Sequence, residues 1–388
     1  MNTVQASQRG KPRIALMTYA IDGRRAKGTA IVARKSVEAL LKRRDEFDLT
    51  FIHYEKSDDP IYSHGVREVI FPSFTIPFLN FRSLRQIYYF VTTKDLYDIA
   101  HWFQPRVYPF FWLVPAKRIV ATLHGAGDLT PDNRILLSRF VFNWTLKLFN
   151  KRIHAAIAGS EFAKKDIVEK YGFSSERVHV VEGGAESYFE PATEEAIAAV
   201  KRKYELPDFF FLNVARLEYT KNAFRTMRAF EKFAREVRES DIHFVNVGNK
   251  GLEKPQVADF LQKSPLKHRI HLVGYVEEKD LPAMYSAAYA LVFPLMNEGF
   301  GLPALEAMAC KTPVVISETA FPEIQRDEAI LVDALSEDSI AKAMRQLVEH
   351  PEIRNGLIER GYAKAKTLTW EETGRKVIAI YKKLLQEI

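Results

Sequence analysis

Two glutamates flank a glycine-rich stretch near residue 300 in a pattern that suits a long anionic ligand. Glu298 stands directly before Gly299 and close to Gly301, and Glu306 follows Glu298 by eight residues. Glycines let the backbone approach a ligand closely, and Pro303 is typical of the first turn of a helix. A helix that begins here would present free N–H groups, which bind anions such as phosphate.

Two carboxylates in one stretch also raise the question of a glycosidase acid/base pair. Eight residues of helix span roughly 12 Å, whereas a retaining glycosidase needs about 5 Å between its carboxyl groups. Glu298 and Glu306 therefore favour contacts with two different parts of one ligand. The alternative is an ordinary strand–loop–helix turn that carries two surface glutamates.

A second loop carries two cations that suit the same kind of ligand. Arg216 and Lys221 stand five residues apart, between an apolar run at 209–217 and an amphipathic segment at 222–236. The pattern predicts a strand, a loop and a helix, so both side chains can reach the carboxyl edge of a sheet. An arginine that binds bidentately and a lysine that acts as a point charge suit a diphosphate. Two solvated surface cations are the alternative.

Apolar strand-like runs alternate with amphipathic helix-like segments along nearly the whole chain, which predicts an α/β fold. A chain of 388 residues favours two domains. The segment ESYFEPATEE at 186–195 predicts the linker between them. Two further candidates follow predicted strands of the first half: a loop that contains Gly28, and His124, which would point into the ligand crevice at the end of its strand.

The residues E-G-F-G-L-P-A-L-E-A-M-A at 298–309 resemble the E-x7-E motif of retaining glycosyltransferases of family 4, which have the GT-B fold. The resemblance implies that Glu298 lies against the donor sugar and that Glu306 holds the ribose hydroxyls. It also implies that the backbone of Gly299, Phe300, Gly301 and Leu302 meets sugar and phosphate. One departure is Lys311, where the family usually has glycine; it lies past the ligand loop.

The same resemblance extends to other loops from about residue 13 to residue 380. It implies that Arg216 and Lys221 clamp the diphosphate, that His124 contacts the donor sugar, and that Gly248 belongs to the donor site. The backbone at Tyr275 and Val276 would read the nucleobase edge. The turn at 27–30, which in the family touches donor phosphate or acceptor, matches the family at Gly28 but has Ala30 in place of a second glycine; the resemblance implies that Gly28 binds the donor. The residues expected near the acceptor are Lys27, Thr29 and Trp102.

Charge and composition bound the partners of the chain. The net charge is +7, but residues 1–190 carry 28 Lys and Arg against 20 Asp and Glu, so the basic excess belongs to the first half. Such asymmetry predicts an anionic partner for that half, with a merely basic surface as the alternative. The segment 71–115 is rich in aromatics with interspersed arginines, which suits a membrane surface, sugar stacking or a core. No basic-aromatic RNA motif is present, so we expect no nucleic-acid partner.

The single cysteine, Cys310, allows no disulfide within the chain and favours a reducing compartment. The first residues, MNTVQASQRGKPR, lack an apolar signal core, and no apolar run is long enough to span a membrane. We therefore expect a cytoplasmic protein with peripheral binding to the inner face of the plasma membrane. No carboxylate pair has metal-ligand spacing, so neither a metal nor a cofactor is expected.

Together these observations predict two Rossmann-like domains that face each other across a cleft. The expected domains are 1–187, which binds acceptor, and 188–370, which binds the nucleotide sugar, with a helix at 371–388 that packs back on the first. The expected activity is a retaining, metal-independent transfer of a hexose from GDP-mannose or a UDP-sugar to a glycan or lipid-linked acceptor in cell-surface polysaccharide assembly. The alternatives are a GT-B enzyme similar to nucleotide-sugar epimerases and a non-catalytic protein that binds nucleotide sugar or membrane.

Overall fold

The chain folds into two compact units. The computed structural model describes residues 10–21, 28–72, 82–103, 110–123, 136–237, 241–248, 255–296, 301–319 and 323–388. Residues 1–182 and 370–388 form unit 1, and residues 183–369 form unit 2. The chain thus leaves unit 1 at Glu182 and returns to it at Trp370, near the boundaries at 187 and 370 that the sequence suggests.

Unit 1 is built on a parallel sheet of seven strands in the order β3-β2-β1-β4-β5-β6-β7. Its strands are β1 (Arg13–Met17), β2 (Asp48–His53), β3 (Arg67–Ile70), β4 (Tyr97–Trp102), β5 (Ala116–Thr122), β6 (Ala155–Ala158) and β7 (Val178–Val180). Its helices are α1 (Gly28–Leu41), α2 (Arg82–Thr92), α3 (Leu136–Phe149), α4 (Glu161–Tyr171) and α12 (Trp370–Gln386).

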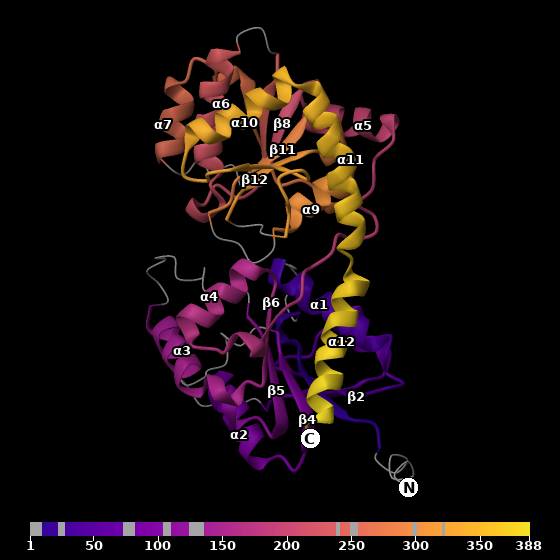
Figure 1. The fold of residues 1–388 in the computed structure, drawn as a ribbon. Coiled ribbons are helices and arrows are strands. Elements are labelled where there is room, and N and C mark those ends of the chain that lie inside the picture. The colour runs from indigo at the N-terminus through magenta and orange to yellow at the C-terminus, as the bar shows by residue number, and fades with distance from the viewer. Residues whose placement is uncertain are drawn as a thin grey trace. The chain divides into compact units, whose positions relative to one another are not determined.

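Both faces of this sheet are buried, which explains the continuous apolar runs of its strands. In β1, Ala15 and Met17 pack in a core layer with residues of α3 and α4, while Ile14 and Leu16 pack in a second layer with residues of α1 and α12. Figure 1 shows the same division, with α2, α3 and α4 on one side of the sheet and α1 and α12 on the other.

The last helix crosses back to unit 1, as predicted. Its Tyr381 is fully buried and its hydroxyl lies 2.6 Å from Nδ1 of His101 on β4, whose other ring nitrogen lies 2.8 Å from the hydroxyl of Thr122. Burial lowers the pKa of His101 to about 3, so this imidazole stays neutral at physiological pH. Gly374 brings α12 into close contact with α1, because a methyl group at this position would overlap the methyl of Ala39.

We expect Gly374→Ala to lower the free energy of unfolding of unit 1 by about 1–3 kcal/mol, the usual cost of overpacking a buried contact. Gly356→Ala on α11 (Pro351–Thr367) is the matched control, since its new methyl would meet only the far end of the Arg360 side chain. In a helix interior that exchange gains up to about 1 kcal/mol. The melting temperature should therefore fall in Gly374→Ala and rise in Gly356→Ala. Equal shifts in the two variants would contradict the close contact between α12 and α1.

Unit 2 contains a parallel sheet of six strands in the order β10-β9-β8-β11-β12-β13. Its strands are β8 (Phe210–Val214), β9 (His243–Val247), β10 (Ile270–Gly274), β11 (Ala290–Phe293), β12 (Val314–Ser317) and β13 (Ile330–Val332). Its helices are α5 (Glu194–Tyr204), α6 (Ala223–Glu236), α7 (Pro255–Lys263), α8 (Leu281–Ala287), α9 (Leu302–Ala309), α10 (Glu337–Glu349) and α11 (Pro351–Thr367).

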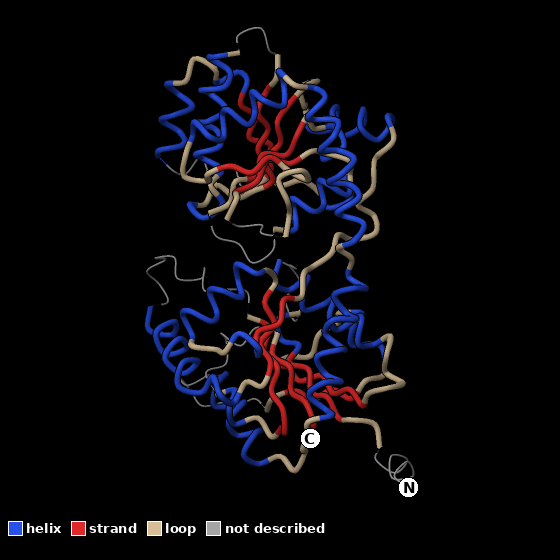
Figure 2. Tube along the Cα trace, in the orientation of Figure 1, coloured by secondary structure: helices blue, strands red, loops and turns tan. Residues whose placement is uncertain are grey.

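Each sheet reverses its strand order at one point, as in a Rossmann fold. In unit 2 the chain moves outward from β8 through β9 to β10, then returns to pair β11 with the other side of β8. Figure 2 shows the strands of each unit gathered in one sheet with the helices outside it. Ligands of such sheets bind outside the carboxyl ends of the strands at the reversal, which in unit 2 lies between β8 and β11.

The aromatic segment at 71–115 contributes mainly to the core of unit 1 where the structure describes it. Its fully or nearly fully buried rings are Phe71, Phe90, Tyr97, Trp102, Phe103 and Phe111. The segment also contains α2, whose exposed face carries Leu84, Tyr88 and Val91. Within the described ranges, no helix combines the length and the apolar character needed to cross a membrane.

Candidate functional site

The loop between β8 and α6 carries the two predicted cations at the reversal point of unit 2. Arg216 lies two residues past the end of β8, and its guanidinium is 2.5 Å from a carboxylate oxygen of Glu218. Lys221 ends a short 3-10 turn (Tyr219–Lys221), and Asn222 separates it from α6. Backbone hydrogen bonds hold the loop compact: the amide of Glu218 donates to Arg216, and the amide of Lys221 donates to Glu218.

Lys221 is electrostatically poised for an anion. Burial holds the pKa of its ammonium below the ordinary value, the neighbouring charge of Arg216 acts in the same direction, and Glu218 opposes both. An incoming diphosphate would place negative charge beside two cations that now destabilise each other. Anion binding at this loop is therefore favoured by Coulomb attraction and by relief of the repulsion between Arg216 and Lys221.

The loop between β11 and α9 contains the glycine-rich stretch. Glu298, Gly299 and Phe300 lie outside the described residues. Gly301 caps α9 with a left-handed backbone (φ 67°), a conformation that glycine adopts without strain. Helix α9 begins at Leu302, has proline in its first turn and receives no side-chain cap at Gly301, so its first N–H groups can bind an anion.

Glu306 lies on α9 and is half-buried. The hydroxyl of Tyr285, a fully buried residue of α8, donates to its carboxylate at 2.8 Å. Burial raises the pKa of Glu306 to about 7; the Tyr285 hydrogen bond opposes this rise, and the charges of Glu278 and Glu186 add to it. Glu306 can thus bind hydroxyl groups as an acceptor when ionised and as a donor when protonated.

Three further predicted residues lie at the ends of the neighbouring strands. Gly248 follows β9 with φ 141°, and a Cβ atom there would come within 2.5 Å of the Ala215 carbonyl oxygen, so only glycine fits. Tyr275 follows β10 with its side chain 83% exposed, and the adjacent Val276 is buried. The predicted donor residues of unit 2 that the structure describes therefore follow four adjacent strands at one edge of its sheet.

The predicted residues of unit 1 follow β1 and β5 in the chain or, for Trp102, end β4; these three strands are neighbours in the sheet. Helix α1 begins at Gly28 and includes Thr29, so their amides lie at a helix N-terminus. Lys27 and His124 lie outside the described residues. Trp102 corrects the expectation of an acceptor contact: its side chain is fully buried and packs against Phe90, which leaves no surface for a ligand.

The structure adds residues that the sequence did not indicate. Tyr285 stands 21 residues before its hydrogen-bond partner Glu306. The charge of Glu278 raises the pKa of Glu306. No local sequence pattern predicts either interaction. Asn222 follows Lys221 directly and is buried with a left-handed backbone (φ 57°). Asparagine at the start of a helix was the available signal for it.

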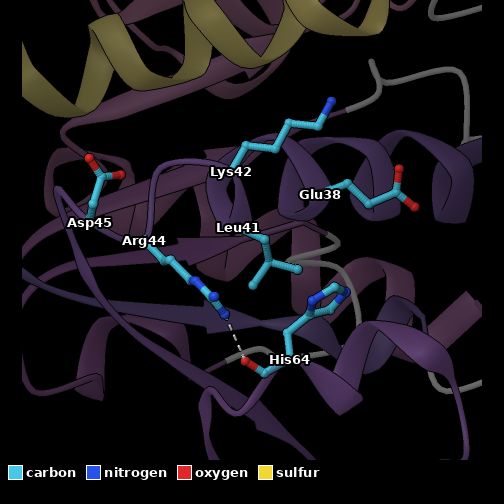
Figure 3. A pocket seen from close by; sticks show the side chains of 6 residues that line it. All are labelled: Glu38, Leu41, Lys42, Arg44, Asp45 and His64. Carbon is cyan, nitrogen blue, oxygen red and sulfur yellow. Dashed lines mark hydrogen bonds between the residues drawn. The ribbon is translucent and has the colours of Figure 1, made fainter.

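One cavity of unit 1 lies away from this chemistry. It encloses about 590 Å³ beyond the last turn of α1 and before β2, at the amino ends of the strands. Figure 3 shows its six side chains, with Arg44 donating to the carbonyl of His64. The cations and carboxylates that line it offset each other, so its charge favours no ionic ligand. The lining residues are Glu38, Leu41, Lys42, Arg44, Asp45 and His64.

In the part of the chain that the structure describes, no group of three or more His, Cys, Asp or Glu side chains is arranged to hold a metal ion. Independence from metal stays a prediction.

Two family models match the chain in succession. Residues 26–187 match the family described as Glycosyltransferase Family 4, and residues 196–364 match Glycosyl transferases group 1. The O-antigen chain mannosyltransferase B of Escherichia coli is 30% identical over 227 residues, which cover 58% of this chain and 59% of that protein. The match therefore spans less than two thirds of that relative.

Solved structures share the fold over nearly the full chain. Sucrose-phosphate synthase from Thermosynechococcus elongatus superposes with a TM-score of 0.76 at 19% identity, covering 97% of this chain and 100% of that one. HepE of Anabaena in complex with UDP-glucose superposes with a TM-score of 0.73 at 15% identity, covering 96% and 99%. At these identities the likeness concerns the fold.

Proposed function

We propose that this chain, which belongs to the GT-B glycosyltransferases of family 4, transfers a hexose from a nucleotide-diphospho-sugar to a glycan or lipid-linked acceptor. One observation carries the proposal: the Arg216–Lys221 loop and the N-terminus of α9 follow β8 and β11, the two strands that meet at the reversal of the sheet. Both supply positive electrostatic potential where a diphosphate would sit.

The proposed chemistry needs this potential because charge grows on the diphosphate as the glycosidic bond breaks. Arg216, Lys221 and the amides at the start of α9 would stabilise the leaving diphosphate. Glu298 and His124 would orient the sugar, and Glu306 would hold the ribose. We further propose that the reaction retains the anomeric configuration, with the leaving phosphate helping to deprotonate the acceptor, and that it needs no metal.

GDP-mannose is the first donor to test, since a relative is named a mannosyltransferase, and a UDP-sugar is the second, since a solved relative holds UDP-glucose. The mannosyltransferase relative is also named for the O-antigen chain, which supports a role in assembling cell-surface polysaccharide. The purified chain should be incubated with a panel of GDP- and UDP-sugars, with and without EDTA, while release of nucleoside diphosphate is measured.

Each outcome of the panel separates the candidate functions. The proposal is supported if one donor releases nucleoside diphosphate, if an acceptor accelerates this release, and if EDTA leaves it unchanged. NMR of the product then tests retention of the anomeric configuration. Conversion of the nucleotide sugar to an epimer in the absence of acceptor would favour an enzyme similar to nucleotide-sugar epimerases. Binding of a nucleotide sugar without turnover would favour a non-catalytic protein, and absence of any binding would overturn the proposal.

We also propose that unit 1 binds an anionic membrane surface through α2. Leu84, Tyr88 and Val91 recur at helical spacing and are 45%, 50% and 64% exposed, and unit 1 contains most of the basic half of the chain. An apolar helix face combined with positive charge suits an interfacial helix. Other exposed apolar residues of unit 1 include Ile70, Leu96, Trp144 and Leu148.

Flotation with vesicles that contain phosphatidylglycerol tests this surface. The chain should float at low salt and less at high salt, because screening weakens charge attraction. Leu84→Glu with Val91→Glu should lower the bound fraction about tenfold or more, since charged groups replace the side chains that would enter the interface. Phe209→Glu in unit 2, at a residue of similar exposure, is the control. Failure of the unaltered chain to float at low salt would favour a soluble acceptor.

A further inference from the structure

Asn222 joins three loops at the carboxyl edge of the unit 2 sheet. Its side chain is buried, and its Nδ2 donates to the carbonyl oxygens of Pro294 at 2.8 Å and Ala334 at 2.6 Å. Pro294 is the first residue after β11, and Ala334 stands two residues after β13. One amide group thus uses both of its N–H donors to tie the start of α6 to the loops after two other strands.

The surrounding contacts fix the orientation of this amide. Arg225, one turn along α6, donates to Oδ1 of Asn222 at 2.5 Å. The Asn222 carbonyl oxygen in turn accepts from the amide and the hydroxyl of Thr226, both at 3.0 Å. The backbone of Asn222 is left-handed, a conformation that asparagine tolerates better than most residues. Its side chain and backbone are therefore both held in one arrangement.

We propose that Asn222 is a positioning residue that holds Lys221 in place relative to the loops after β11 and β13, so that Lys221 and the start of α9 meet the same diphosphate. Lys221 precedes Asn222 in the chain, and the loop that begins at Pro294 leads to α9. The proposal rests on the proposed function for the identity of the ligand, but the placement of Lys221 does not depend on it. Displacements of about 1 Å can cost an enzyme about a hundredfold in rate.

Asn213 provides a control that separates positioning from general stability. It is also fully buried, and its Nδ2 donates to the carbonyl of Val292 at 2.6 Å. This hydrogen bond joins β8 to β11 within the sheet, away from the loops after these strands. Removing it should destabilise unit 2 in a similar way without moving Lys221.

The test compares Asn222→Gly, which keeps the left-handed backbone but removes the amide, with Asn213→Ala. Affinity for GDP and UDP is measured by calorimetry well below the melting temperature of each variant. Asn222→Gly should weaken binding of the preferred nucleotide at least tenfold, while Asn213→Ala should change it less than twofold. Equal losses in both variants, or unchanged binding in Asn222→Gly, would overturn the proposal.

A second readout tests the placement of Lys221 without a nucleotide. The acylation rate of Lys221 by acetic anhydride, followed across pH by peptide mass spectrometry, reports the fraction of neutral amine. Its apparent pKa is expected below the ordinary lysine value in the unaltered chain and in Asn213→Ala, and higher in Asn222→Gly, where the released ammonium becomes solvated. An unchanged profile in Asn222→Gly would overturn the positioning role, whereas failure of the unaltered chain to bind GDP or UDP would count against the proposed function alone.

Discussion

Replacing Lys221 with alanine is expected to lower turnover at saturating donor by about a hundredfold or more, the usual effect of losing a group that stabilises charge in the transition state. Lys221 is half-buried beside Arg216, and its pKa is lowered first by burial. A cation in such surroundings interacts more strongly with a growing charge than one in bulk water. Because that charge is largest as the glycosidic bond breaks, the loss should fall on kcat more than on KM.

The control for this variant is Lys232→Ala on α6, the helix that follows Lys221. Lys232 is more exposed and forms ion pairs with Glu337 and Asp338, so its loss removes a surface contact of small worth. Turnover should stay within about twofold of the unaltered chain. A Lys221→Ala variant that turned over normally at saturating donor would show that the leaving diphosphate is stabilised elsewhere.

The positions of the loops in unit 2 could be predicted because alternation of strands and helices fixes which ends of the strands meet. Arg216, Gly248 and Tyr275 each follow an apolar run, and parallel strands bring such residues to one edge. The return of the chain from unit 2 to α12 was also anticipated. What the residues alone could not supply was the neighbour of each strand, since β8 pairs with β11 across 75 intervening residues.

Helix α2 shows why the aromatic segment was difficult to interpret. Its sequence, RSLRQIYYFVT, has apolar residues on two faces. Its apolar stripe of Leu84, Tyr88 and Val91 is exposed, whereas Arg85, Gln86 and Phe90 are buried. The stripe therefore does not mark the core-facing side, as it does in most surface helices. Composition alone left core, membrane and sugar-stacking roles open. Trp102 of the same segment was expected near the acceptor, but its side chain is buried.

The least predictable part of the site is its network of long-range polar contacts. Asn222 meets Pro294 and Ala334 at separations of 72 and 112 residues. Glu306 meets Tyr285 on another helix. These contacts depend on how α6, α8 and α9 pack against the sheet, which no local pattern encodes. The Tyr285 hydrogen bond opposes the rise that burial causes in the pKa of Glu306, and in our proposal Asn222 places Lys221.

Replacing Glu306 with glutamine is expected to raise the donor KM about tenfold or more at pH 8, with little change of kcat at saturating donor. Hydrogen bonds to a charged acceptor contribute about 1.5–3 kcal/mol, roughly twice those to a neutral one. In the proposed role Glu306 holds the ribose, far from the breaking bond, so the ground and transition states lose the same interaction. Gln keeps the shape of the side chain, so folding should survive.

The pH dependence gives this variant a distinctive signature. Because burial raises the pKa of Glu306 to about 7, donor affinity of the unaltered chain should increase as pH rises through 7 and the carboxylate forms. Glu306→Gln should lack this increase. Glu278→Gln is the matched variant: it removes a charge that raises the pKa of Glu306, so the increase should occur at lower pH while affinity at pH 8 is kept.

The stability of the folded chain should fall as Glu306 loses its proton, whereas donor affinity should rise. The folded chain keeps Glu306 protonated up to about pH 7, whereas the ordinary pKa of 4.5 applies when the chain is unfolded. The folded state therefore binds more protons between these values, and its stability from this group is full below pH 4.5 and declines as pH rises toward 7. Glu306→Gln removes this decline, so its Tm relative to the unaltered chain should be higher at pH 8 than at pH 5.

Abolished turnover at saturating donor in Glu306→Gln, together with normal turnover in Lys221→Ala, would contradict both assigned roles and require a catalytic carboxylate on α9.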